Sequence, residues 1–264
     1  MRRARVRAMP AFPDRLGGLS RGDDWSIVDH LAFTFELPLA TVEALLPARV
    51  SPVRPAPGLG LVQLIHARYP AGTLGEPEPF DEVVCAALVE PDLSLDMPLP
   101  KVTLHVVDVL SNSARFVAHK VPALKMPVHH APSLRGAFDA DGHGSKVEDE
   151  RGPLLELRCP DASRFKPKSF CGQYFALYEG TLHHSVWAWQ GSLFESQRAR
   201  RDTGVVHAHP WLAGLGLEAL THAPCFMRQL REPGQPVSMR TYAARPFVSD
   251  RAASGYDGVS APSP

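Results

Sequence analysis

The run Glu82-Val83-Val84-Cys85-Ala86-Ala87-Leu88-Val89-Glu90 is apolar at every position between its two glutamates. A run of this length and composition predicts a β-strand that is buried on both faces of a sheet. Two more strand-length runs lie on either side of it along the chain, at residues 59–69 and 102–110. We therefore expect strands in succession through the first half of the chain.

The rest of the chain is broken into short pieces by 26 prolines and 20 glycines. Such spacing favours strands and loops over long helices. Trp187 and Trp189 should share one side of a strand, because successive side chains alternate between faces. Further strands are expected at 31–37, 154–158 and 181–189, short helices at 38–46, 113–120 and 210–220, and a hairpin tip near 139–144, whereas 170–178 fits helix or strand.

The domain organisation follows from composition. Residues 1–24 are expected to be a flexible segment, and residues 249–264 form a Ser, Gly, Pro and Ala-rich tail that should be disordered. Residues 25–248 show no internal repeat and no boundary, so they predict a single domain. The fold class expected is α+β but mainly β.

Charge and hydropathy exclude several classes of protein. Lysines and arginines (28) balance aspartates and glutamates (28), so no nucleic-acid partner is expected. The basic run at residues 1–7 is not followed by an apolar stretch, and nothing approaches the roughly 18 apolar residues that span a bilayer. We expect a cytoplasmic, soluble protein without a membrane partner, whose four cysteines are separate and do not form a disulfide framework.

Twelve histidines raise the question of a metal. His207 and His209 would share a face on a strand, which is a plausible spacing for two ligands. The sequence has no His-Glu-x-x-His and no Cys/His cluster, and it also has no Gly-x-Ser-x-Gly. We therefore expect no metal, no other cofactor and no serine hydrolase chemistry.

Lys125 stands between Leu124 and Met126 in a proline-flanked apolar segment. A lysine amine that is kept neutral by burial can condense with a carbonyl group. The alternative is a lysine whose stem packs on apolar surface while its ammonium reaches water.

Several segments resemble the acetoacetate decarboxylase-like superfamily. Residues 28–47 are similar to its first strand and helix, which end in Leu-Pro, and residues 78–83 are similar to its Gly-Pro-Tyr-x-Glu segment. Residues 106–108 and 113–115 resemble the strand and helix that precede the family's reactive Lys-Lys pair, so that Lys125 falls at or beside that pair. Residues 170–178 and 207–211 resemble motifs of a sister group of uncharacterised bacterial proteins.

The resemblance implies a cone-like closed antiparallel β-barrel with a few peripheral helices around a small pocket. It implies that Lys125 forms a Schiff base with a small keto acid or carbonyl compound, and that Glu82 orients substrate or moves a proton. Large assemblies in the family imply a homo-oligomer. The residues expected to bind substrate are His30, His119, Tyr174 and Trp187.

Three departures from the family pattern bear on activity. The lysine pair is absent, and Lys120 could supply a second cation only if the chain folds it back toward the pocket. Ala118-His119-Lys120 stands where the family has Gly-Arg-Glu, and His30 stands where it has a carboxylate-binding arginine. Glu82 could also be a structural carboxylate, paired with an arginine such as Arg115.

Two functions therefore remain open. The first is a decarboxylase-like lyase that works through Lys125. The second is a barrel without catalytic activity that binds a small apolar or carboxylate ligand among its aromatic side chains.

Overall fold

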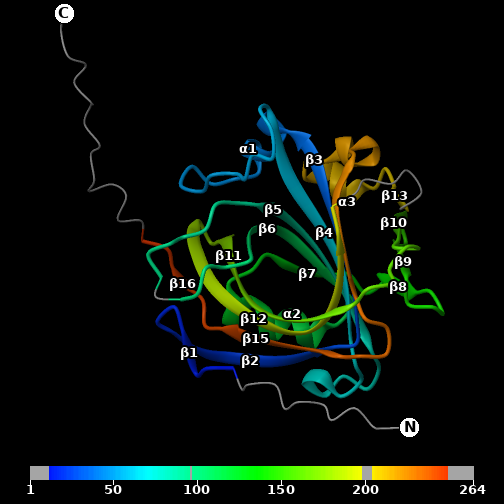
Figure 1. Cartoon of the computed structure of the whole chain (residues 1–264), viewed down its shortest axis with the longest axis horizontal. Coiled ribbons are helices and arrows are strands. Elements are labelled where there is room, and N and C mark those ends of the chain that lie inside the picture. Colours follow the sequence, from blue (N-terminus) through cyan, green and yellow to red (C-terminus); the bar gives the residue numbers. More distant parts are fainter. Residues whose placement is uncertain (1–11, 96, 198–203, 249–264) are drawn as a thin grey trace, which may run out of the picture.

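The computed structural model describes residues 12–95, 97–197 and 204–248. Most of these residues are in strands, and the main sheet closes on itself (Figure 1). Its closed part runs in the order β12-β11-β6-β5-β4-β3-β14, and β14 pairs with both β3 and β12, which completes a seven-stranded barrel. The expected mainly β, closed-barrel fold is confirmed.

The barrel strands match the sequence prediction closely at the centre and less closely at the ends. They are β3 (Asp29–Pro38), β4 (Leu59–Tyr69), β5 (Phe80–Leu88), β6 (Val102–Ser111), β11 (Lys166–Tyr178), β12 (Thr181–Ser196) and β14 (Cys225–Arg231). Neighbours within the barrel are antiparallel except β6 and β11, which are parallel and joined by a long crossover segment. Residues 170–178, which fitted helix or strand, belong to β11.

Other strands extend the main sheet beyond the barrel. They are β1 (Arg15–Leu16), β2 (Leu19–Ile27), β15 (Val237–Tyr242) and β16 (Arg245–Pro246). Residues 12–24 were expected to be flexible, but they contain β1 and most of β2, and Leu16 and Leu19 are buried. The partner of β2 is β15, more than two hundred residues away, so local sequence could not reveal this pairing. Residues 1–11 and 249–264 lie outside the described residues.

Helix α2 (Ala114–Leu124) connects β6 to β7 (Val128–His130), which lies parallel to β6. Ser113 caps the helix, because its hydroxyl oxygen accepts a hydrogen bond from the Phe116 backbone N–H at 3.0 Å. The helix continues one turn beyond the predicted end at Lys120. Phe116, Lys120 and Leu124 lie four residues apart on its buried face, and burial of this whole stripe stabilises the extra turn.

A second, smaller sheet covers part of the outer face of the barrel. It consists of β8 (Arg135–Phe138), β9 (Gly144–Asp149), β10 (Gly152–Arg158) and β13 (Gly204–Val206). The β8–β9 connection is the hairpin predicted near residues 139–144. The ring of Phe138 stacks on His66 of β4, with the ring centroids 4.4 Å apart. Hydrophobic side chains between the two sheets form a core that is separate from the barrel interior.

The short helical segments lie at the periphery (Figure 1). They are α1 (Leu39–Ala44), α3 (Pro210–Gly214), and the 3-10 turns η1 (Thr73–Gly75) and η2 (Glu218–His222). The helix expected over 210–220 is divided, because Gly216 has a φ of 70° that no continuous right-handed helix contains. In the described part of the chain, no helix is both long and apolar enough to span a membrane.

Candidate active site

The barrel interior holds a cavity of about 120 Å³ that is lined mostly by apolar side chains. Period-two alternation of the strands produces this lining: on β4, for example, Gln63, Ile65, Ala67 and Tyr69 face inward. The other lining residues are Ile27, His30, Glu82, Val84, Val102, Leu104, Val106, Lys120, Leu124, Met126, Phe170, Tyr174, Trp187, Trp189, Leu193, Gln229, Met239 and Thr241.

A buried lysine and a buried glutamate meet at the wall of this cavity. Lys120 Nζ lies 3.2 Å from Glu82 Oε1, and the two side chains are only 4% and 5% exposed. The Tyr69 hydroxyl donates to Glu82 Oε2 at 2.6 Å. Burial, together with the adjacent Glu82 carboxylate, raises the pKa of Tyr69 well above its ordinary value, so Tyr69 stays protonated as a donor.

Three aromatic rings lie close to the Lys120 ammonium. Its Nζ lies 4.5 Å from the ring centroid of Phe116, 5.2 Å from that of Trp25 and 5.9 Å from that of Tyr69. Cation–π attraction to these rings partly offsets the cost of burying the cation. The rings also limit the positions of the amine, which must project from α2 toward the cavity.

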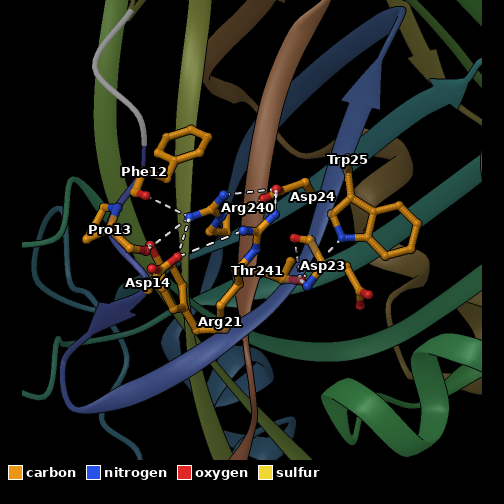
Figure 2. A network of polar contacts seen from close by, with 10 residues as sticks. Phe12, Pro13, Asp14, Arg21, Asp23, Asp24, Trp25, Arg240 and Thr241 are labelled. Carbon is orange, nitrogen blue, oxygen red and sulfur yellow. Dashed lines mark hydrogen bonds and ion pairs between the residues drawn. The ribbon is translucent and has the colours of Figure 1, made fainter.

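The position of Trp25 is in turn fixed by a polar network between β2 and β15 (Figure 2). The Trp25 indole N–H donates to Thr241 Oγ1 at 3.2 Å. Next to it, Arg240 forms two hydrogen bonds with the carboxylate of Asp24, at 2.5 and 2.9 Å, and donates to the carbonyl of Phe12 at 2.7 Å. The N-terminal strands thus hold one wall of the lysine site.

His30 of β3 lines the cavity beside Trp189, with the ring centroids 4.9 Å apart. Burial is the main cause that lowers the pKa of His30 to about 3, and the nearby Arg231 adds to it. His30 is therefore neutral at physiological pH. Within the described chain, neither His30 Nδ1 nor Trp189 Nε1 has a hydrogen-bond partner.

Four of the six predicted site residues line the cavity: Glu82, His30, Tyr174 and Trp187. Trp187 and Trp189 share the inward side of β12, as predicted. The Tyr174 hydroxyl donates to the carbonyl of Leu124 at 3.2 Å, which attaches β11 to the end of α2.

The expectation that Lys125 and Glu82 share one cavity is corrected. Lys125 is the C-cap of α2 in the left-handed conformation, with φ 54°, and it is absent from the described lining, whereas its neighbours Leu124 and Met126 are part of it. Its Nζ lies 5.1 Å from the ring centroid of Tyr178. The helix ends at this point, so the backbone turns and directs the side chain elsewhere.

His119 also lies outside the lining. It pairs with Asp23 at 2.9 Å and packs against the edge of Trp25, so it supports the wall of the site from behind. The alternative considered for Glu82, a pairing with an arginine such as Arg115, is not found: Glu82 pairs with Lys120, and Arg115 donates to the carbonyl of Gly75 at 2.6 Å.

From the sequence, Lys120 is expected only as a second cation beside Lys125, not as the lysine that meets Glu82. The sequence does contain a signal for a buried lysine. Phe116, Lys120 and Leu124 form a stripe along one face of the helix, and the other two members of the stripe are apolar. A lysine inside the buried stripe of a helix needs a partner in the interior.

The histidine pairs near the C-terminal half have protein partners. His209 caps α3 by accepting from the Trp211 backbone N–H at 3.2 Å, and its other ring nitrogen lies 3.0 Å from Asp149. His207 lies 3.3 Å from Glu156. Over the described ranges, no three or more histidine, cysteine or acidic side chains gather in a way that would hold a metal ion.

Comparison with known proteins places this barrel among the acetoacetate decarboxylase-like folds. No family model matches the sequence, and no curated protein is significantly similar to it in sequence. The solved structure of the enduracididine biosynthesis enzyme MppR matches with a TM-score of 0.58 at 11% identity, over 85% of this chain and 86% of MppR. MppR has also been solved with the condensation product of pyruvate and imidazole 4-carboxaldehyde.

Two acetoacetate decarboxylase structures show the same likeness. The enzyme from Legionella pneumophila matches with a TM-score of 0.55 at 10% identity, over 92% of this chain and 93% of that one. Another acetoacetate decarboxylase matches with a TM-score of 0.54 at 8% identity, over 87% of this chain and 91% of that one. The chain therefore has the acetoacetate decarboxylase-like fold, as the sequence resemblance implied.

Proposed function

We propose that this protein is a lyase-type enzyme that forms a Schiff base between Lys120 and a small carbonyl compound. The observation that carries the proposal is the buried Lys120 amine at an apolar cavity, 3.2 Å from the Glu82 carboxylate. The resemblance implied that Lys125 forms the Schiff base, and we assign this role to Lys120 in its place. The proposal requires no cofactor.

The first step needs a proton acceptor, and Glu82 is in position. Its carboxylate takes a proton from the Lys120 ammonium, and the free amine attacks the carbonyl carbon to give a carbinolamine. Glu82 then returns a proton to the departing hydroxyl, so that one water leaves and an imine forms. Tyr69 holds the Glu82 carboxylate at 2.6 Å through both steps.

The protonated imine withdraws electrons from the bond beside the former carbonyl. Loss of carbon dioxide from a β-keto acid, or loss of an α-proton to Glu82, leaves the electron pair in an enamine. Addition of a proton to the enamine and hydrolysis of the imine restore Lys120. The low polarity of the cavity favours these steps because they disperse charge.

Borohydride trapping tests the proposal. The protein is incubated with small ketones, aldehydes and keto acids, reduced, and analysed by intact mass and peptide mapping. We expect a stable adduct on Lys120, loss of the adduct in Lys120→Ala, and retention of it in the matched control Lys125→Ala. An adduct confined to Lys125, or none with any probe, would contradict the proposal.

The apolar lining supports a second candidate, a barrel that only binds a small ligand. Trp187 and Trp189 line the cavity, so ligand binding should change tryptophan fluorescence. Fluorescence changes without any adduct would favour this second function.

A further inference from the structure

The fixed charges at the cavity cancel. The ionised side chains that line it are Lys120 and Glu82, which pair with each other at 3.2 Å. A ligand carboxylate in this cavity would meet one cation that already has a partner, and it would also meet the negative charge of Glu82. Burying a carboxylate without its own counter-charge is strongly unfavourable.

The remaining basic groups near the cavity do not supply that counter-charge. His30 faces the cavity as a neutral ring. Arg231, behind it, is bound to the carboxylate of Asp29 at 2.7 Å and to the carbonyls of Glu232 and Gln235. Its two terminal nitrogens are therefore bound to the protein, its Nε has no partner in the described chain, and Arg231 is not part of the lining.

Two lysines stand beside the strand ends that border the cavity, where they share the single carboxylate of Glu195 and are partly exposed to solvent. Lys101 and Lys168 both bind the carboxylate of Glu195, and Lys101 Nζ lies 4.7 Å from the ring centroid of Phe170. Neither lysine belongs to the lining, and both are about one-third exposed, at 33% and 28%. They lie at the solvent border rather than next to Lys120.

The polar atoms that the cavity does offer suit a neutral ligand. Trp189 is 4% exposed, lines the cavity and has an indole N–H without a partner in the described chain. Beside it is the unpartnered Nδ1 of His30. An indole N–H can donate to the oxygen of a carbonyl or hydroxyl group. The volume of about 120 Å³ is comparable with the roughly 150 Å³ of an apolar cavity that accepts one benzene.

From these contacts we propose that the cavity selects a neutral, apolar aldehyde or ketone, of about the size of one aromatic ring or a branched five- to seven-carbon chain, and rejects carboxylates. The proposal rests on the proposed function, because Lys120 is the group that condenses with the carbonyl. Of the two imine reactions described under the proposed function, this selectivity retains only the loss of an α-proton, because a neutral ligand has no carboxylate to lose. Glu82 takes that proton, exchanges it with solvent water and returns a proton to the enamine carbon, which restores the imine and the Glu82 carboxylate; hydrolysis of the imine then releases the ligand and Lys120.

An isosteric pair of probes tests the selectivity: 5-methylhexan-2-one and levulinate have the same skeleton, with an isopropyl group in the first and a carboxylate in the second. Borohydride trapping on Lys120 is measured for each and divided by trapping on N-α-acetyl-lysine, which corrects for the reactivity of the ketone itself. We expect the neutral probe to be favoured by about tenfold or more. Equal trapping, or a preference for levulinate, overturns the proposal.

A variant that adds a positive charge beside the cavity provides a second test of the selectivity. His30→Arg adds a cation beside the cavity and should raise levulinate trapping relative to the neutral probe, whereas His30→Gln, the neutral control, should not. Circular dichroism and thermal unfolding show whether each variant is folded. An unchanged ratio in a folded His30→Arg protein would contradict the proposed role of charge.

Failure of the proposed function has a different signature. If neither probe gives an adduct, the Schiff-base chemistry is wrong, and tryptophan fluorescence titration with the same two probes decides the ligand class. Tighter binding of 5-methylhexan-2-one retains the proposal for a binding protein. Equal binding, tighter binding of levulinate or no binding of either probe overturns it.

Discussion

Asp81 and Glu82 are neighbours on β5, each 4% exposed, yet they belong to different regions of the molecule. Asp81 points outward to the interface with the smaller sheet, where it accepts hydrogen bonds from His66 at 3.0 Å, Arg68 at 2.9 and 3.2 Å and the Gly136 N–H at 3.2 Å. Glu82 points inward to Lys120 and Tyr69. Two adjacent carboxylates therefore acquire different environments from strand alternation alone.

The difference teaches how to separate a structural carboxylate from one that is available for chemistry. Burial alone would raise the pKa of Asp81, but the hydrogen bonds from His66 and Arg68 outweigh it and hold the pKa at about 2. Both oxygens of Asp81 have protein donors, as do both oxygens of Glu82, so the difference lies in what surrounds each pair of donors. Glu82 instead lies at the edge of a cavity, where a ligand can reach its partner Lys120.

The largest effect should follow a change on the inward side. Glu82→Gln removes the proton acceptor while its amide oxygen can still accept from Lys120. We expect exchange of the α-hydrogens of 5-methylhexan-2-one with deuterated water, followed by NMR, to fall by about 100-fold or more. Lys120 would lose its counter-charge in the interior, so the free energy of unfolding should also fall, by about 3 kcal/mol, and exchange is compared per folded molecule. Exchange at the wild-type rate would remove Glu82 from the mechanism.

The matching change on the outward side should lower stability and leave exchange almost unchanged. Asp81→Asn leaves Arg68 and His66 without their carboxylate, and we expect the free energy of unfolding in urea to fall by about 3 kcal/mol. Exchange per folded molecule should stay within about threefold of wild type, since Asp81 does not reach the cavity. A stable variant with lost activity would show that the two sides are not separable.

Because His30 is neutral in the folded protein, the free energy of unfolding should depend on pH. Its folded pKa of about 3 lies below the ordinary 6.5, so between these values the unfolded chain binds a proton that the folded chain does not. Stability is complete above pH 6.5 and falls toward pH 3, by at most about 1.4 kcal/mol per pH unit for this group. Urea unfolding at pH 7, 6 and 5 should show a shallower loss in His30→Asn than in wild type.

Other buried histidines should also lower the stability of the protein as the pH falls. Burial lowers the pKa of His105 and of His184 to about 4. Both remain in His30→Asn, so the variant should retain part of the acid sensitivity. Identical slopes in the two proteins would mean that His30 is accessible to protons in the folded state.

The smallest effect concerns the second lysine of α2. Lys125 adopts φ 54°, which glycine tolerates better, so Lys125→Gly should raise the free energy of unfolding by about 0.5–1 kcal/mol. Trapping on Lys120 should be unchanged. A loss of trapping in this variant would show that the helix end controls the site.

The sequence predicted the central strands well because their signals are local. Residues 59–69 and 102–110 became β4 and β6 within one residue at each end. Strand β5 begins two residues earlier than predicted, and β12 continues seven residues beyond Trp189, because pairing with neighbours sets where a strand ends. The alternation of Trp187 and Trp189 followed from the same local rule.

The amino-acid sequence by itself determined the mainly β class, the opposite directions of Asp81 and Glu82 on their strand, and a short helix after β6. Only the tertiary structure decided which lysine of that helix meets Glu82. That choice depends on where the helix ends, and burial of Leu124 inside the barrel carries α2 past Lys120 and places Lys125 at its cap. The pairing of β2 with β15 could not be predicted from the sequence either, because it joins opposite ends of the chain.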